Sequence, residues 1–171
     1  MSFETRLSGG HPNSLGNTVD VVEEILADKR KLAELYACYS SPNEVVRLRT
    51  SNAFKRIMKE QPDWLTDYLD KFLSEVSELE QASAQWTLAQ LFAGLERFMS
   101  AEQLDRAKAV VKRNLETSDD WIVLNNSMQT LADWAKADAD LKSWLEPHLH
   151  RLATDPRKSV SGRAKKLLES S

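Results

Sequence analysis

Apolar residues recur along this chain at helical spacing, in four sets that follow one another at nearly constant intervals. Within a set the spacing is i, i+4, i+7, i+8 and, in three of the sets, i+11, which places the residues on one face of an α-helix. The first members lie 38, 40 and 36 residues apart (46 to 84, 84 to 124 and 124 to 160). A period of about 40 residues is typical of stacked helical repeats. The four sets are Val46, Thr50, Ala53, Phe54 and Ile57; Ala84, Leu88, Leu91, Phe92 and Leu95; Leu124, Met128, Leu131, Ala132 and Ala135; and Val160, Ala164, Leu167 and Leu168.

The pattern predicts an all-α fold, a right-handed α-α superhelix of about four helix pairs preceded by a capping helix. Residues 1–17 are rich in Gly, Ser and Asn and predict a flexible or irregular lead-in, and residues 18–171 predict a single domain. The capping helix is expected over about 18–28, with Thr18 as N-cap and a buried stripe of Val19, Val22 and Leu26. The pairs are expected at about 29–40 and 43–60, 62–76 and 79–98, 100–116 and 119–136, and 139–153 and 156–169. An ordinary helical bundle is the alternative, but a bundle does not require a fixed interval.

Local signals support several of these helix boundaries. Pro62 stands where a first-turn proline is tolerated, and Ser100 with Gln103 forms a capping-box pattern. Ser118 and Asp119 are candidates to cap the helix that follows them. Pro147 lies inside the expected helix 139–153 and predicts a kink there.

Composition narrows the class of protein. The chain has 171 residues, 42% of them hydrophobic and 29% charged, as in a folded soluble domain. It has no apolar run near the ~20 residues of a membrane helix, and its N-terminus lacks a secretory signal. Cys38 is the only cysteine, which excludes an intramolecular disulfide. A cytoplasmic protein without membrane contact, monomeric or weakly oligomeric, is expected, and the net charge of −3 disfavours a dedicated nucleic-acid binder.

Two stretches resemble HEAT repeats. The first runs from residues 32–36 through 42–47 to Ala53 and Phe54, and the second from residues 144–147 through Asp155 and Pro156 to residues 160–164. The spacing extends the resemblance over about residues 29–169. The first pair lacks the family's helix proline and has Ser41 in place of the turn Asp, and Ser161 stands where the family has Arg.

The resemblance implies a small HEAT-like protein of the bacterial type that serves as a scaffold. Most members of the family hold protein partners on a concave surface lined by the second helices. The resemblance also implies that Arg47 ties neighbouring repeats together through a turn carboxylate. A minority of the family contact nucleic acid, including alkylpurine DNA glycosylases built from HEAT-like repeats.

The concave surface can be assigned by helical geometry. At 100° per residue, positions two, six and nine after the first core residue of a second helix point away from the core. Leu48 and Trp86 are large apolar residues at such positions, and aromatic anchors dominate binding energetics. The alternative for Trp86 is that it fills a gap between adjacent second helices. The predicted partner-binding groove comprises Leu48, Asn52, Lys55, Arg56, Lys59, Trp86, Gln90, Arg97, Asn126 and Thr130.

Charge is distributed unevenly among the expected helices. The second helices 43–60 and 156–169 are basic, whereas the first helix 62–76 is acidic. A basic inner side favours an acidic protein partner. The alternative is a solvated surface in which cations lie near helix C-termini, as the helix dipole favours.

No residue set demands catalysis, a metal or a cofactor. His148 and His150 point roughly 200° apart on a helix and cannot chelate one ion together. Cys38 is expected to be an inert, buried or half-buried thiol. The enzyme alternative is a HEAT-like DNA glycosylase, with Lys55, Arg56, Trp86 and Arg97 holding the duplex and Asp133 as the acid.

The sequence therefore predicts a non-enzymatic scaffold or adaptor that binds a partner peptide or helix in the groove. Nucleic-acid binding in the same groove is the main alternative, and steep salt dependence would distinguish it. Two further hypotheses are a structural subunit that docks through residues 157–169, and occlusion of the groove by residues 1–17.

Overall fold

The computed structural model describes residues 1–170, and every regular element in that range is helical. The predicted all-α class is therefore confirmed. None of the described helices is both long and apolar enough to cross a membrane. The α-helices and the shorter 3₁₀ turns, written η, are α1 (Phe3–Leu7), α2 (Thr18–Ala27), η1 (Lys29–Lys31), α3 (Leu32–Ala37), η2 (Cys38–Ser40), α4 (Glu44–Glu60), η3 (Pro62–Tyr68), α5 (Leu69–Ser74), η4 (Val76–Glu78), α6 (Ala82–Gly94), η5 (Glu96–Phe98), α7 (Ala101–Thr117), α8 (Trp121–Ala135), α9 (Ala139–Leu152) and α10 (Lys158–Glu169).

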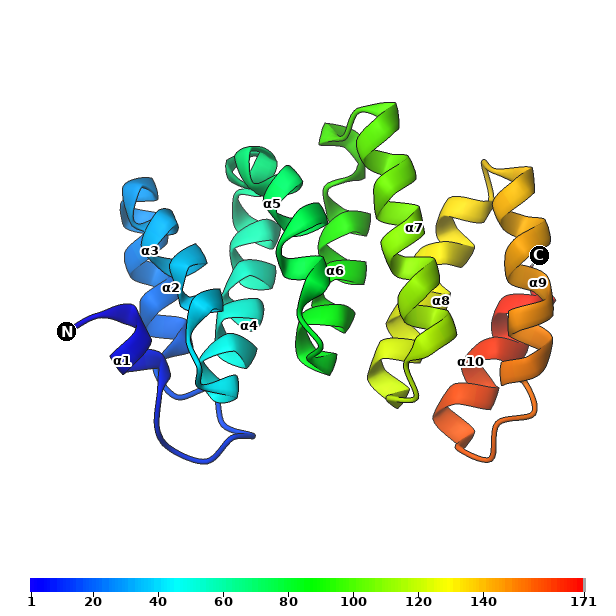
Figure 1. Cartoon of the computed structure of the whole chain (residues 1–171), viewed down its shortest axis with the longest axis horizontal. Helices are drawn as coiled ribbons and strands as arrows, with labels where there is room; N and C mark the ends of the chain where they lie inside the picture. The colour runs from blue at the N-terminus through cyan, green and yellow to red at the C-terminus, as the bar shows by residue number, and fades with distance from the viewer. Residues whose placement is uncertain (171) are drawn as a thin grey trace.

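The chain progresses along the long axis of the molecule, from α1 to α3 at one end to α9 and α10 at the other (Figure 1). Helix α4 packs against α2 and α6, and α8 packs against α6 and α10. Helices α2, α4, α6, α8 and α10 therefore form a continuous row, here called the second-helix layer. Helix α7 contacts α5, α6 and α8, and α9 contacts α8 and α10, so each of these two helices bridges neighbouring members of the row.

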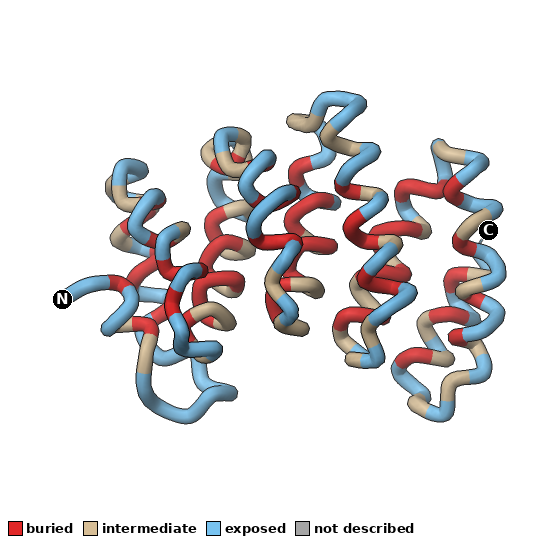
Figure 2. The backbone as a smooth tube through the Cα atoms, viewed as in Figure 1, coloured by how far each residue is buried: buried red, intermediate tan, exposed pale blue. Residues whose placement is uncertain are grey.

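The core contains most members of the four apolar sets found in the sequence, which are called here the frame residues. All five frame residues of α4 are buried, and so are the four that lie within α6 and the Leu95 that follows it. Of the frame residues in α8 and α10, all are buried except Ala132 and Leu168, which are half-buried. Figure 2 shows buried segments on each helix of the layer, while most connecting loops are exposed. Each helix buries one face against its neighbours, and this face is the one marked by apolar residues in the sequence.

The first helices of the first two pairs are shorter than predicted. Residues 29–40 form η1, α3 and η2, and residues 62–78 form η3, α5 and η4, whereas α7 and α9 are continuous. Pro62 opens η3, where its missing N–H leaves no bond unmade. The apolar pattern did not reveal the breaks. Over such short stretches a 3₁₀ helix, with about three residues per turn, and an α-helix, with about 3.6, give similar spacing of apolar residues.

The N-terminal segment contains a short helix that the sequence pattern did not predict, followed by an irregular loop over residues 8–17. Residues 3–7 form α1, which buries Phe3 and Leu7 and packs against α2, α3 and α4. The loop that follows is fastened by Arg49 of α4, a residue that is only 1% exposed. Its guanidinium donates to the carbonyl oxygens of Leu7 (2.9 Å), Gly9 (2.6 Å), His11 (3.0 Å) and Ser14 (3.2 Å).

Helix α2 is rotated relative to its predicted orientation. Its buried residues are Thr18, Val21, Val22 and Ile25, and Val19 is 37% exposed. Thr18 does not cap the helix, because its hydroxyl donates to the Leu15 carbonyl and Asn17 occupies the cap position. Since α2 packs on α1 as well as on α4, its buried face depends on a helix that the sequence pattern did not reveal.

Arginines connect successive turns. Arg47 donates to the Ser41 carbonyl at 2.6 Å and to the Gln81 side-chain oxygen at 2.7 Å, so it joins the first turn to the start of α6. The predicted tie between neighbouring pairs is present, but its acceptors are a carbonyl and an amide rather than a carboxylate. Arg157 likewise donates to the Asp119 carbonyl at 2.6 Å, across the third and fourth pairs.

The helix caps agree in part with the predicted signals. The capping box of Ser100 and Gln103 is confirmed, with reciprocal bonds of 3.1 and 2.9 Å. Asp120, rather than Ser118 or Asp119, caps α8 by accepting from the backbone of its first turn. Pro147 lies inside α9, as expected.

Candidate functional site

Nine of the ten predicted groove residues lie on three adjacent helices of the second-helix layer: α4, α6 and α8. Eight of them define the surface called here the second-helix face. All eight are half-buried except Lys59, which is exposed at the end of α4. The second-helix face comprises Leu48, Asn52, Lys55, Arg56, Lys59, Trp86, Gln90 and Asn126.

Two predicted residues fall outside this face. Thr130 is only 5% exposed, and its hydroxyl donates to the Ala89 carbonyl of α6 at 3.0 Å. This threonine therefore joins α8 to α6 and is not open to a partner. Arg97 lies in η5, because α6 ends at Gly94, and its guanidinium covers the Phe98 ring 4.7 Å from the ring centroid. The helical register therefore no longer applies to Arg97.

Leu48 and Trp86 are the large apolar residues of the second-helix face. Both are half-buried, so Trp86 is not fully enclosed between helices. The indole N–H of Trp86 donates no hydrogen bond to any residue in 1–170. An indole whose ring is half-covered and whose N–H has no protein partner is suited to accept further contacts.

Amide side chains link the helices of the face. Gln90 of α6 donates to the Asn126 side-chain oxygen of α8 at 3.0 Å, and Asn126 donates to the Ile122 carbonyl at 2.9 Å. On α4, Arg56 donates to the Asn52 side-chain oxygen at 2.7 Å. The side-chain oxygen of Gln90 is buried and accepts no bond from the described residues. The bond between Gln90 and Asn126 therefore connects α6 to α8 on this face.

Positive charge in the second-helix layer is confined to α4 and α10. The sequences of α6 and α8 contain no Lys or Arg, and Asp133 is their only charged residue. The basic helices α4 and α10 are therefore separated by two neutral or acidic helices. The predicted basic inner side is in fact two patches, with amides and Trp86 between them.

The cations of α4 line a cavity of about 310 Å³ between α2 and α4. Helix α2 contributes an apolar wall together with one carboxylate. This wall was missed in the sequence because the predicted stripe of α2 placed Val19 in the core. The cavity is lined by Val19, Val22, Glu23, Leu26, Lys55, Arg56, Lys59 and Glu60.

Lys55 is subject to charge repulsion in this cavity. Partial burial lowers its pKa from the ordinary value, and repulsion from Lys59 and Arg56 lowers it further. Neither Lys55 nor Lys59 forms an ion pair or hydrogen bond with the described part of the chain. An anionic group that entered the cavity would relieve this repulsion.

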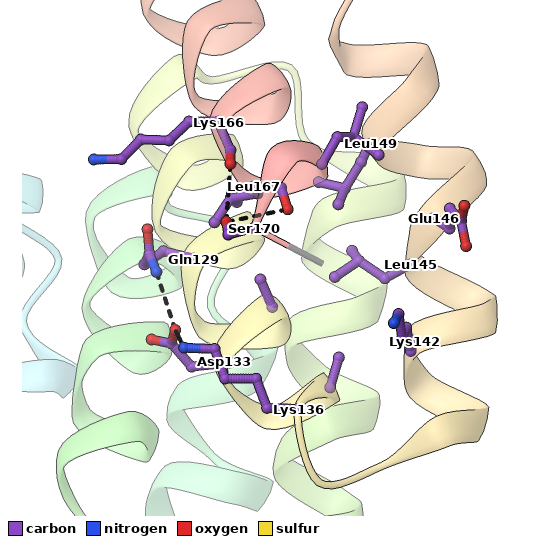
Figure 3. Close-up of a pocket in the computed structure, with 13 residues that line it drawn as sticks. Gln129, Asp133, Lys136, Lys142, Leu145, Glu146, Leu149, Lys166, Leu167 and Ser170 are labelled. Atoms are coloured by element: carbon purple, nitrogen blue, oxygen red, sulfur yellow. Dashed lines mark hydrogen bonds and ion pairs between the residues drawn. The ribbon is translucent and has the colours of Figure 1, made fainter.

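A second cavity, of about 420 Å³, lies among α8, α9 and α10 (Figure 3). Leu145 and Leu149 of α9 and Leu167 of α10 form its apolar wall. Asp133 lies at its edge, accepts a bond from Gln129 at 3.1 Å and pairs with Lys136 at 3.6 Å. The acid considered for a glycosylase is therefore held by two neighbours and lines a different cavity from Lys55 and Arg56.

The remaining candidates for chemistry have structural surroundings. Burial raises the pKa of the Cys38 thiol to about 11, with a smaller contribution from Glu34, and the thiol donates to the Glu34 carbonyl. His148 is half-buried against the Trp144 ring, with ring centroids 4.3 Å apart. Among residues 1–170 no three His, Cys, Asp or Glu side chains are grouped closely enough to hold a metal ion.

The four tryptophans outside the second-helix face differ in exposure. Trp64, Trp121, Trp134 and Trp144 lie on or beside apolar stripes, yet only Trp134 is buried. Trp121 is 49% exposed, because it is the first residue of α8 and precedes the part of the helix that packs.

Comparison with models of protein families, with curated proteins and with solved structures finds no match.

Proposed function

We propose that this chain is a short HEAT-like α-solenoid that binds a segment of a protein partner on the second-helix face and carries out no reaction. The repeat interval of 36 to 40 residues and the continuous row from α2 to α10 support a stacked-repeat architecture. The second-helix face is the surface that such an architecture presents as its groove. A cytoplasmic location stays a prediction from the sequence.

The observation that carries the proposal is the character of the centre of the face. Leu48 and Trp86 present apolar surface on adjacent helices, and the hydrogen-bonded amides of Gln90 and Asn126 lie on the same face. A half-covered aromatic residue bordered by polar groups resembles the centre of a protein interface, where aromatic anchors supply most of the binding energy. The part of each side chain that stays exposed is apolar surface that a partner would cover.

The same surface argues against nucleic acid as the ligand. A duplex or single strand needs a continuous track of cations along its phosphates. Helices α6 and α8, which carry no cation, interrupt such a track between α4 and α10. The glycosylase alternative loses further support because Asp133 is paired with Lys136 beside the C-terminal cavity.

The proposal is tested by affinity capture from nuclease-treated lysate of the host cell, with the wild type and two tryptophan variants. Trp86→Ala removes the anchor of the face. Trp144→Ala removes another half-buried tryptophan, on α9 outside the second-helix layer, and controls for loss of stability. We expect one protein to be recovered by the wild type and by Trp144→Ala, but not by Trp86→Ala. Equal recovery by all three, or loss with Trp144→Ala alone, contradicts the proposal.

The salt dependence of the recovered complex is the second arm. An apolar anchor predicts that affinity changes by less than about tenfold between roughly 50 and 200 mM salt, because few counterions are released. Contacts to about six or more phosphates predict a loss of roughly a thousandfold over the same range. A steep slope therefore supports the nucleic-acid alternative.

A further inference from the structure

The cavity between α2 and α4 combines an exposed apolar wall with cations that have no anionic partner. We propose that it receives an acidic segment of the partner, with carboxylates beside Lys55 and Lys59 and an apolar side chain against Val19 and Leu26. This inference rests on the proposed function and specifies where the partner binds and what chemistry it carries.

The cationic side of the cavity is the first line of support. Lys55, Arg56 and Lys59 lie within two turns of α4, and the bond from Arg56 to Asn52 is the one polar contact that their charged groups make within residues 1–170. Glu23 and Glu60 also line the cavity, but neither forms an ion pair with these cations in the described chain. Lys59 and Arg56 therefore repel Lys55, and no ion pair within residues 1–170 offsets this repulsion. A carboxylate supplied by a partner is the complementary charge.

The apolar side is an independent observation. Val19 and Leu15 are 37% and 39% exposed and belong to the few large apolar residues exposed in residues 1–170. Leu15 lies in the loop before α2 and Val19 in its first turn, and Val19 borders the cavity with half-buried Leu26. A ligand with charge alone would leave this apolar surface in water. An acidic segment that also carries an apolar residue would cover it.

The size of the cavity fits part of a longer ligand. Its volume of about 310 Å³ is at the lower end of the range for small-molecule pockets. It can therefore hold one or two side chains, while the rest of the segment continues over α4 toward Trp86 on α6. A phosphate chain fits less well, because it carries no apolar group to cover Val19 and Leu26.

The test uses peptides of defined sequence. Random peptides of about 12 residues displayed on phage are selected on the immobilised wild-type protein, and the most enriched peptide is synthesised with a fluorescent label for anisotropy measurements. We expect enrichment of Asp and Glu next to large apolar residues. We also expect the double variant Lys55→Gln, Lys59→Gln to bind this peptide at least about tenfold more weakly than the wild type.

Variants of opposite sign make the test specific. Glu23→Gln removes a competing carboxylate from the cavity and should strengthen binding of the same peptide a few-fold. The control Lys165→Gln, Lys166→Gln removes two cations from α10 and should leave the affinity unchanged. Urea unfolding of each variant confirms that it folds. Enriched peptides without acidic residues, or unchanged affinity in the Lys55→Gln, Lys59→Gln variant, overturn the inference.

Failure of this inference can be distinguished from failure of the proposed function. If Trp86→Ala weakens peptide binding but the two lysine substitutions do not, the partner binds the second-helix face without using this cavity. A labelled single strand of about 12 nucleotides is measured alongside the peptide. Tighter binding of that strand than of the peptide, lost with the same lysine substitutions, also overturns the inference.

Discussion

The two halves of α4 carry cations in opposite surroundings. In the N-terminal half, Arg47 binds the Ser41 carbonyl and the Gln81 side chain, and Arg49 is buried among four carbonyl oxygens. In the C-terminal half, Lys55 and Lys59 line a cavity and have no bonded partner among residues 1–170.

The contrast separates cations that hold the fold from cations that are available to a ligand. All of these side chains lie on one helix, and the count of Lys and Arg does not distinguish their roles. What distinguishes them is the supply of acceptors. The N-terminal half of α4 faces loops whose carbonyl oxygens accept hydrogen bonds from its arginines. The C-terminal half faces the apolar wall of α2. Substitutions in the first half should therefore change stability, and those in the second half should change binding.

The largest effect is expected from Arg49→Ala. The change leaves the carbonyl oxygens of Leu7, Gly9 and Ser14 without a donor, whereas His11 still accepts from the Ser14 backbone N–H. It also opens a cavity, so we expect a loss of about 3–5 kcal/mol in the free energy of unfolding. Urea unfolding followed by tryptophan fluorescence measures it. Lys59→Ala is the control on the same helix and should change stability by less than about 0.5 kcal/mol. A loss below about 1 kcal/mol for Arg49→Ala would show that the loop does not depend on this side chain.

Arg47→Ala should have an intermediate effect. Its two hydrogen bonds join neighbouring turns, and their loss is expected to lower stability by about 1–2 kcal/mol. Gln81→Ala removes the same side-chain contact, so the effects of the two substitutions should not add in the double variant. Strict additivity in this double-mutant cycle would indicate that the bond contributes nothing to stability.

Two glycines of the N-terminal loop test the packing around Arg49. Gly9 and Gly16 both have positive φ, of 78° and 54°, so alanine is strained at either position. A Cβ on Gly16 would lie 2.9 Å from the Arg49 guanidinium, whereas one on Gly9 meets nothing within 4 Å. Gly16→Ala should therefore be less stable than Gly9→Ala by about 1 kcal/mol in the same urea assay. Equal losses would mean that the loop yields without disturbing Arg49.

The smallest effect is expected from Lys55→Met. The pKa of Lys55 is lower in the folded protein than its ordinary value of 10.5, so the unfolded chain binds more protons between these two values. Wild-type stability should therefore rise with pH through that window, and Lys55→Met should remove this rise. At neutral pH the variant should be more stable by at most about 0.5 kcal/mol, because solvent screens a half-exposed charge. A clear loss of stability would assign Lys55 to the structural group.

The sequence predicted the fold where one pattern decides the packing. Helices α4, α6 and α8 each have one apolar face, and the structure buries nearly all the frame residues on it. The orientation of α2 could not be predicted, because it depends on contacts with α1 and on the loop around Arg49. That arrangement follows from hydrogen bonds between residues some forty positions apart. Such bonds leave no trace in the spacing of apolar residues along one helix.

The candidate site was predictable only in its central part. Helical arithmetic placed Leu48, Trp86 and Asn126 on adjacent helices, but it continued the helix past Gly94 and so misplaced Arg97. It also missed the burial of Thr130, which arises from a bond to the neighbouring helix. The α2 wall of the cavity was hidden for the same reason that the rotation of α2 was.

Binding on the second-helix face can be observed directly by NMR titration of the ¹⁵N-labelled protein with the selected peptide, following the indole N–H signals of the five tryptophans. Each signal is assigned with a Trp→Phe variant. Trp86 is the only one of the five on the second-helix face, and Trp64, Trp121, Trp134 and Trp144 report on other parts of the molecule. We predict that the Trp86 signal shifts in proportion to the bound fraction while that of Trp144 stays in place. A shift of the other indole signals with Trp86 unchanged would place the partner elsewhere and contradict the proposed function.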